Sequence, residues 1–87
     1  MKTVDFRKIE VENIDGGKDY ADVSKQLGNQ MYMQGQNIEE CELGRDIYHN
    51  GEVVMEDRQV EMVRKFIAVW AYVMRTAVEN ALSNREQ

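Results

Sequence analysis

Cys41 and His49 are the only thiol and the only imidazole in this sequence, so they form its one possible cysteine–histidine pair. An imidazole that takes the proton of a thiol can activate it as a nucleophile. Both residues fall in one predicted helix, where their spacing separates them by about 12 Å along the axis and about 80° around it. Direct contact within one chain is therefore excluded while this helix holds. We expect Cys41 to pack as a small apolar side chain and His49 to interact with the helix dipole, and we do not expect an enzyme.

Carboxylates are concentrated in the middle of the chain, at Glu39, Glu40, Glu42 and Asp46, with Glu52, Glu56 and Asp57 beyond them. Such a surface can attract divalent cations or a basic protein partner. The segment has neither a calcium-loop pattern nor a pair of histidines, so we expect no metal site and no cofactor. The first four carboxylates are interpreted as a solvated helix face, with an acidic patch for a basic partner as the alternative.

Residues 24–50 outline two short helices about a glycine turn, followed by an extended piece, which is the order of a winged helix-turn-helix. The would-be recognition helix begins Asn-Ile-Glu-Glu-Cys-Glu and would place carboxylates against phosphates. A net charge of −5 also opposes binding to a phosphate backbone. A nucleic-acid-linked regulator is therefore the second hypothesis rather than the first. Gly28, Gly35 and Gly44 lack phosphate-loop spacing, so no nucleotide site is predicted.

These residues are expected to sit in a single α+β domain, residues 1–87, with the element order β-β-α-α-β-α. Apolar residues alternate along the N-terminal stretch, at Val4, Phe6, Ile9, Val11 and Ile14. The alternation slips at Arg7-Lys8, as a β-bulge would produce. Asp15-Gly16-Gly17 predicts a hairpin turn, because glycine accepts the positive φ angles of tight turns. A second strand from Lys18 to Val23 should return antiparallel.

Two short helices are expected next. The first is capped by Asp22 or Ser24, ends at Gly35, and buries Val23, Leu27, Met31 and Tyr32. The second begins with a capping box at Asn37 and Glu40 and ends at Asn50-Gly51. Its inward side chains are expected to be Ile38, Cys41, Ile47 and Tyr48, with Leu43 beside them. Glu52–Met55 then predicts a short third strand beside the hairpin.

From Glu56 or Asp57 to about Ser83 the pattern predicts one long helix, roughly 40 Å in length. One stripe has the spacing of a core-facing side: Val60, Val63, Ile67, Trp70, Met74, Ala77, Val78 and Ala81. A second stripe lies beside it: Met62, Phe66, Val69 and Val73. Together they cover an arc of roughly 200°, wider than the ~100° of a typical surface helix. We expect the second stripe to be an interface in a homodimer or higher homo-oligomer, and burial beneath the hairpin of the same chain is the alternative.

The charge distribution supports contact between the middle and the end of the chain, because residues 24–57 are acidic and residues 58–87 are basic on balance. A single cysteine excludes an internal disulfide and suits a reducing cytoplasm. The N-terminal MKTVDFRKIE has no apolar signal core. The apolar run 66–74 is about half the length needed to cross a bilayer, so no membrane association is expected.

The stretch 22–53, with "DVSKQLGNQMY" and "ELGRDIYHNGEV", resembles short uncharacterised proteins carried by phages and integrated elements of gut bacteria. The resemblance covers about a third of the chain and includes no catalytic motif. It implies a small intracellular accessory protein that assembles with itself or with a larger phage or host component. The leading hypothesis is therefore a non-catalytic interaction or assembly protein that self-associates through its C-terminal helix.

Overall fold

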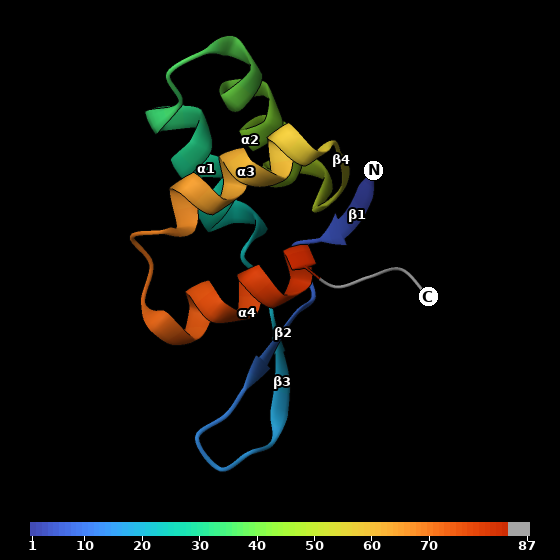
Figure 1. Ribbon diagram of the computed structural model, residues 1–87, viewed down its shortest axis with the longest axis vertical. Helices are drawn as coiled ribbons and strands as arrows, with labels where there is room; N and C mark the ends of the chain where they lie inside the picture. Colours follow the sequence, from blue (N-terminus) through green and yellow to red (C-terminus); the bar gives the residue numbers. More distant parts are fainter. Residues whose placement is uncertain (84–87) are drawn as a thin grey trace.

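The structure, a computed structural model, describes residues 1–83 as an α+β fold of four helices and four short strands (Figure 1). In chain order the elements are β1 (Lys2–Asp5), β2 (Ile9–Glu12), β3 (Lys18–Ala21), α1 (Ser24–Gln34), α2 (Ile38–Asn50), β4 (Glu52–Met55), α3 (Asp57–Ile67) and α4 (Tyr72–Ser83). The predicted fold class is confirmed. The predicted order is wrong at two points, because the N-terminal strand and the C-terminal helix are each divided in two.

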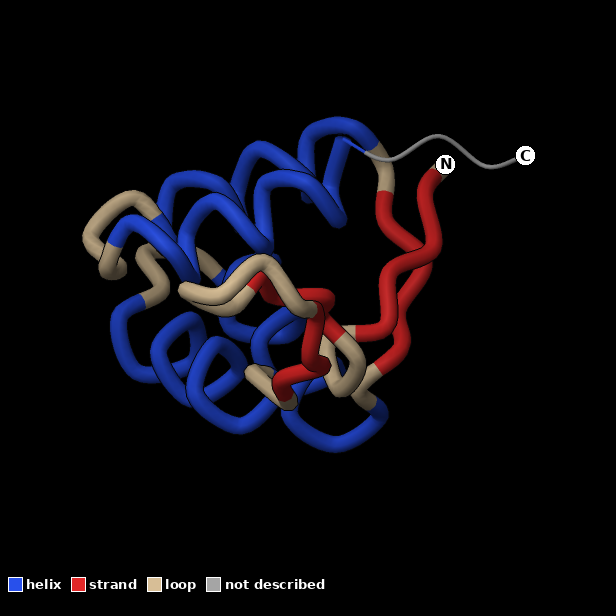
Figure 2. Tube along the Cα trace, turned by 90° about the horizontal axis from the view of Figure 1, so that it is seen from below, coloured by secondary structure: helices blue, strands red, loops and turns tan. Residues whose placement is uncertain are grey.

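The N-terminal stretch divides where its apolar alternation slips. The Asp5 carboxylate accepts hydrogen bonds from the backbone N–H and the Nε–H of Arg7, both at 3.0 Å, and this closes a turn rather than a bulge. The two halves then pair with different partners: β1 runs antiparallel to β4, and β2 runs antiparallel to β3. Figure 2 shows the strand pairs as two separate ribbons, so β4 is not a third strand of the hairpin.

The predicted hairpin turn is confirmed. Gly16 has a φ of 91°, and its N–H donates to the Asn13 carbonyl at 3.0 Å. The Asp15 side chain accepts the Gly17 N–H at 3.0 Å. The hairpin begins beside α4 and projects from the body, at the end of the molecule opposite to α1 and α2 (Figure 1). Its tip is therefore available to other molecules.

The close packing of α1 against α2 depends on two glycines. A Cβ atom on Gly28 would lie 2.6 Å from the Gly44 carbonyl oxygen, and one on Gly44 would lie 2.8 Å from the Gly28 carbonyl oxygen. Only glycine permits such an approach of two helix backbones. This contact decides which side of α2 faces inward. Leu43 and Ile47 are buried with Gly44, whereas Ile38 is 75% exposed.

The inward residues predicted for α1 are confirmed at Val23, Leu27 and Met31. Tyr32 and Tyr48 were expected in the core but are exposed, because the glycine contact places them along the outer edge of the α1–α2 pair. The predicted glycine stop of α2 is present, and half of the predicted capping box is present, because the Glu40 side chain accepts from the Gln36 N–H rather than from that of Asn37. The Asn37 side chain accepts the Glu40 N–H at 2.9 Å, and Gly51 ends the helix with a φ of 77°.

The predicted long helix is wrong, since α3 ends at Ile67 and α4 begins at Tyr72. The segment contains no glycine or proline, and the structure shows a tertiary contact at the break. The Gln30 side chain of α1 donates from Nε2 to the Phe66 carbonyl at 2.8 Å and accepts from Trp70 Nε1 at 2.7 Å. We call this contact the Gln30 clasp. It satisfies a carbonyl at the end of α3, and α4 then folds back and buries Ala77, Val78 and Leu82.

Candidate functional site

The structure gives Cys41 and His49 different neighbours. Cys41 is partly buried, and its Sγ donates to the Tyr32 carbonyl at 3.5 Å. His49 is exposed, and its ring lies edge-on to Tyr48 with 5.3 Å between centroids. Within residues 1–83, no group of three or more His, Cys, Asp or Glu side chains is placed to hold a metal ion. No helix in this part of the chain has the length and apolar character to cross a membrane.

The four carboxylates of the acidic patch do not share one surface. Glu40 was expected to face solvent but is 3% exposed. Its carboxylate accepts from Lys65 Nζ at 2.5 Å and from the Gln36 N–H at 2.9 Å. These two donors lower the pKa of Glu40, with the Lys65 contact as the larger cause. Glu40 therefore has a structural role between α2 and α3.

The remaining members of the patch divide into a paired and an exposed part. Glu39 accepts from Arg58 of α3 at 2.8 Å, so the expected attraction between the middle and the end of the chain occurs within one molecule. Glu42 and Asp46 are exposed. A basic partner for these two carboxylates stays a prediction.

The stripe proposed as an interface is separated by the break between α3 and α4. Phe66 is 7% exposed and packs in the core of its own chain, and Met62 is partly buried against that core. Val69 is 81% exposed and Val73 54% exposed. The four side chains cannot form one helical face, because Val69 lies in the connection between the two helices. Only Val69 and Val73 remain available to a partner.

A revised apolar surface lies at the corner between α3 and α4. Val69, Tyr72 and Val73, which we call the corner surface, are all more than half exposed. Tyr72 and Val73 also line one side of a groove of about 640 Å³, and the hairpin residues from Glu10 to Ile14 line the other side. Ile14 stands at the hairpin tip with its side chain fully exposed. Apolar side chains from two separate parts of the chain therefore gather at this end of the molecule.

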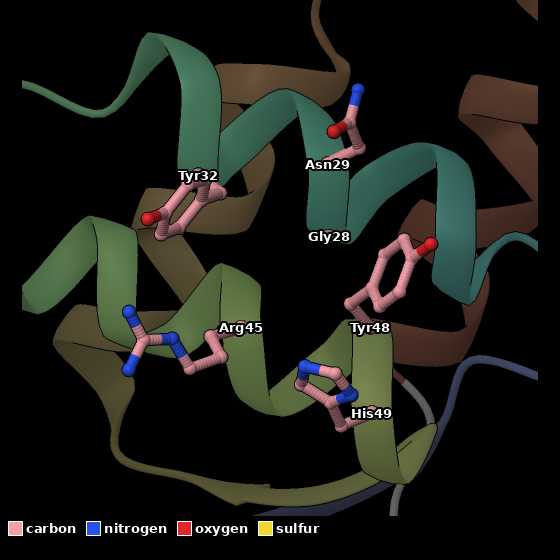
Figure 3. A pocket seen from close by; sticks show the side chains of 6 residues that line it. All are labelled: Gly28, Asn29, Tyr32, Arg45, Tyr48 and His49. Carbon is pink, nitrogen blue, oxygen red and sulfur yellow. The ribbon is translucent and has the colours of Figure 1, made fainter.

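A second groove, of about 260 Å³, lies between α1 and α2 (Figure 3). It is lined by Gly28, Asn29, Tyr32, Arg45, Tyr48 and His49. The Arg45 guanidinium lies 5.5 Å from the centre of the Tyr32 ring. Lys25 Nζ lies 4.2 Å from the centre of the Tyr48 ring and donates to the Tyr48 carbonyl at 3.1 Å. The groove thus combines a glycine floor, aromatic walls and a cationic rim.

Sequence reasoning missed this groove although a signal for it was present. Each helix contains a glycine followed four residues later by a tyrosine, in "GNQMY" and in "GRDIY". Residues four apart lie on one face of a helix, so each tyrosine stands beside the site of close approach. Two successive helices with this spacing predict a backbone contact bordered by two aromatic rings.

Comparison with known proteins gives no relative on which a function could rest, since no family model, curated protein or solved structure matches this chain. The fold and the two grooves define a small α+β protein. The resemblance of residues 22–53 to phage-borne proteins stays a prediction.

Proposed function

We propose that this protein is a non-catalytic assembly protein that self-associates through the corner surface. The observation that carries this proposal is the exposure of Val69, Tyr72 and Val73, which are 81%, 70% and 54% exposed and close together in the chain. Covering a side chain of this size contributes roughly 1.5–3 kcal/mol. Adjacent apolar side chains at a protruding corner are typical of a surface that another molecule covers.

The corner surface adjoins a concave region, which adds area that a partner can contact. The groove between β2 and α4 also presents backbone and charged groups of the hairpin, including Glu10 and Lys18, which pair at 2.7 Å. A polar border around an apolar centre is the usual arrangement of a protein–protein interface.

A cytoplasmic location is part of the proposal, and its support is that the free thiol of Cys41 suits a reducing compartment. An accessory role for a phage or an integrated element rests on the resemblance of residues 22–53 alone.

Sedimentation velocity over a range of protein concentrations tests the proposal. Val73→Lys should shift the wild-type oligomer to monomer, because an ammonium group would be placed in the covered surface. Val54→Lys is a matched control, since Val54 is 56% exposed but lies on β4, away from the corner. The control should assemble like the wild type, and circular dichroism should show that both variants are folded.

A wild-type protein that stays monomeric at high micromolar concentration contradicts the proposal. Equal weakening by Val73→Lys and Val54→Lys also contradicts it, because the effect would then reflect added charge rather than the corner.

A further inference from the structure

We propose that assembly is head to tail: the hairpin tip of one copy, with Ile14 at its centre, occupies the α1–α2 groove of the next copy. This inference rests on the proposed function. It names the surface of one copy that receives the hairpin tip of a neighbouring copy, next to the corner surface of that copy. The occupant is a second copy of this chain.

The α1–α2 groove is lined by one cation, Arg45, that forms no ion pair within the described residues. Within residues 1–83, Arg7, Arg58 and Arg64 each have a carboxylate within salt-bridge distance. Arg45 lies over an aromatic ring and has no carboxylate within that distance in this part of the chain. Arg75 donates instead to the Ala68 carbonyl. In a chain with 16 acidic residues, a guanidinium without a carboxylate partner at the edge of a groove favours an acidic ligand.

Lys25 lies beside the same rim, with its Nζ 4.2 Å from the centre of the Tyr48 ring. Glu42 and Asp46 belong to the same helix as Arg45 but do not line the groove. The tyrosine walls and the glycine floor line a hollow of about 260 Å³, which is just below the usual range for small-molecule sites and large enough to receive an apolar side chain. The groove therefore fits an apolar side chain flanked by carboxylates.

The hairpin tip presents such a side chain. Ile14 is 108% exposed, and Glu12 and Asp15 lie on either side of it in the sequence. The tip projects, whereas the α1–α2 groove is concave, and the carboxylates of Glu12 and Asp15 are opposite in charge to Arg45. A fully exposed isoleucine at the end of a protruding hairpin has no role in the fold, because it contacts none of the core.

The two complementary surfaces lie at opposite ends of the molecule, which measures 41 Å along its longest axis (Figure 1). The tip cannot reach the groove of its own chain, so each copy offers one tip and one groove to different neighbours. Contacts between unlike surfaces give open chains unless the rotation between copies closes a ring. When the tip is occupied, the neighbouring copy also covers Tyr72 and Val73 of the corner surface, because these two residues line the same groove as Ile14.

Complementation between two defective variants tests this arrangement. Ile14→Ser removes the inserted side chain and leaves the groove intact, and Arg45→Glu reverses the charge of the groove and leaves the tip intact. Each variant alone should dissociate the oligomer, with a rise in Kd of about 10- to 100-fold. An equimolar mixture should form a heterodimer that grows no further, since only one tip and one groove remain functional.

Two further variants serve as controls in sedimentation velocity. Met33→Ser removes an exposed apolar side chain that does not line the groove, and Lys8→Glu makes the same change of net charge on another surface. Both should assemble like the wild type. Because the four altered side chains are exposed, all four variants should fold.

Restoration of a dimer by mixing supports the head-to-tail arrangement. If Val73→Lys dissociates the oligomer while Ile14→Ser and Arg45→Glu do not, the inference is overturned and the proposed function stands. A mixture that stays monomeric when both single variants are monomeric also overturns the inference. A monomeric wild type overturns both proposals.

Discussion

Replacement of Gln30 by alanine should destabilise the protein out of proportion to the size of the change. The Gln30 clasp joins α1 to the end of α3 and to the connection before α4 through two hydrogen bonds, of 2.8 Å and 2.7 Å. Its removal leaves a partly buried carbonyl of Phe66 and a partly buried indole N–H of Trp70 without their protein partner. Each such hydrogen bond contributes about 0.5–1.5 kcal/mol net.

The expected loss in the free energy of unfolding is therefore about 1–3 kcal/mol. For a domain of this size, that loss lowers the melting temperature by roughly 5–20 °C. It is also a large part of the total stability, which is about 4–13 kcal/mol for 87 residues. Alanine has a higher helix propensity than glutamine, and this offsets only a few tenths of a kcal/mol.

Urea denaturation followed by Trp70 fluorescence measures this loss, because Trp70 is the only tryptophan. Gln26→Ala is the matched control, since Gln26 is an exposed glutamine one turn earlier in the same helix. The control should leave stability unchanged or slightly higher. In Gln30→Ala the emission of the folded protein should also shift to longer wavelength as the indole becomes more hydrated.

A double-mutant cycle with Trp70→Phe separates the clasp from general packing. If the two residues interact as the structure shows, the double variant loses less stability than the sum of the single variants, with a coupling of at least about 0.5 kcal/mol. Additive losses, or equal losses in Gln30→Ala and Gln26→Ala, would refute the view that the clasp stabilises the junction between α3 and α4.

Two further predictions concern α1 and α2. Gly28→Ala should lower the free energy of unfolding by about 1–3 kcal/mol or more, because its Cβ would lie 2.6 Å from the Gly44 carbonyl oxygen. Gly17→Ala is the control and should leave stability nearly unchanged, because its Cβ would meet only flexible side chains. Thermal denaturation measures both. Glu40→Gln should destabilise the protein at neutral pH. Because Lys65 holds the folded pKa of Glu40 below its ordinary 4.5, that contribution is present above 4.5 and disappears as the pH falls through the folded pKa. Urea denaturation should therefore show the stability difference between wild type and Glu40→Gln shrinking as the pH falls below 4.5, and a difference that stays constant would contradict this assignment.

Local signals in the sequence predicted the ends of most elements. Asp15-Gly16-Gly17 marked the hairpin, and Asn37 and Gly51 marked the limits of α2, because turns and caps depend on residues that are near in sequence. The slip at Arg7-Lys8 was also located correctly. The structural consequence of the slip was predicted wrongly. A bulge would leave one strand with one partner, whereas the turn gives β1 and β2 different partners, and the partner of β1 lies some fifty residues later, at β4.

The break after Ile67 could not be predicted from local pattern, because the segment 57–83 has the composition of an uninterrupted helix. The side chain that binds the Phe66 carbonyl at the end of α3 belongs to α1, and nothing in the helical periodicity identifies a distant glutamine as the partner of Phe66 and Trp70. The inward side of α2 was misassigned for a related reason. Gly44 has no side chain to count as apolar, yet its contact with Gly28 decides which residues face the core.

The break also changes what kind of self-association is physically reasonable. An uninterrupted helix with an exposed stripe would pair with its own copy side by side, as the pattern predicted. In the folded chain, Phe66, Val78 and Leu82 are buried in the core, and the large apolar side chains of residues 57–83 that stay more than half exposed are Val69, Tyr72 and Val73. Three side chains cannot supply the roughly 800 Å² per partner of a stable interface. A corner of this size needs a protruding element and a hollow that receives it, and the hairpin tip and the α1–α2 groove provide these at opposite ends of the same molecule.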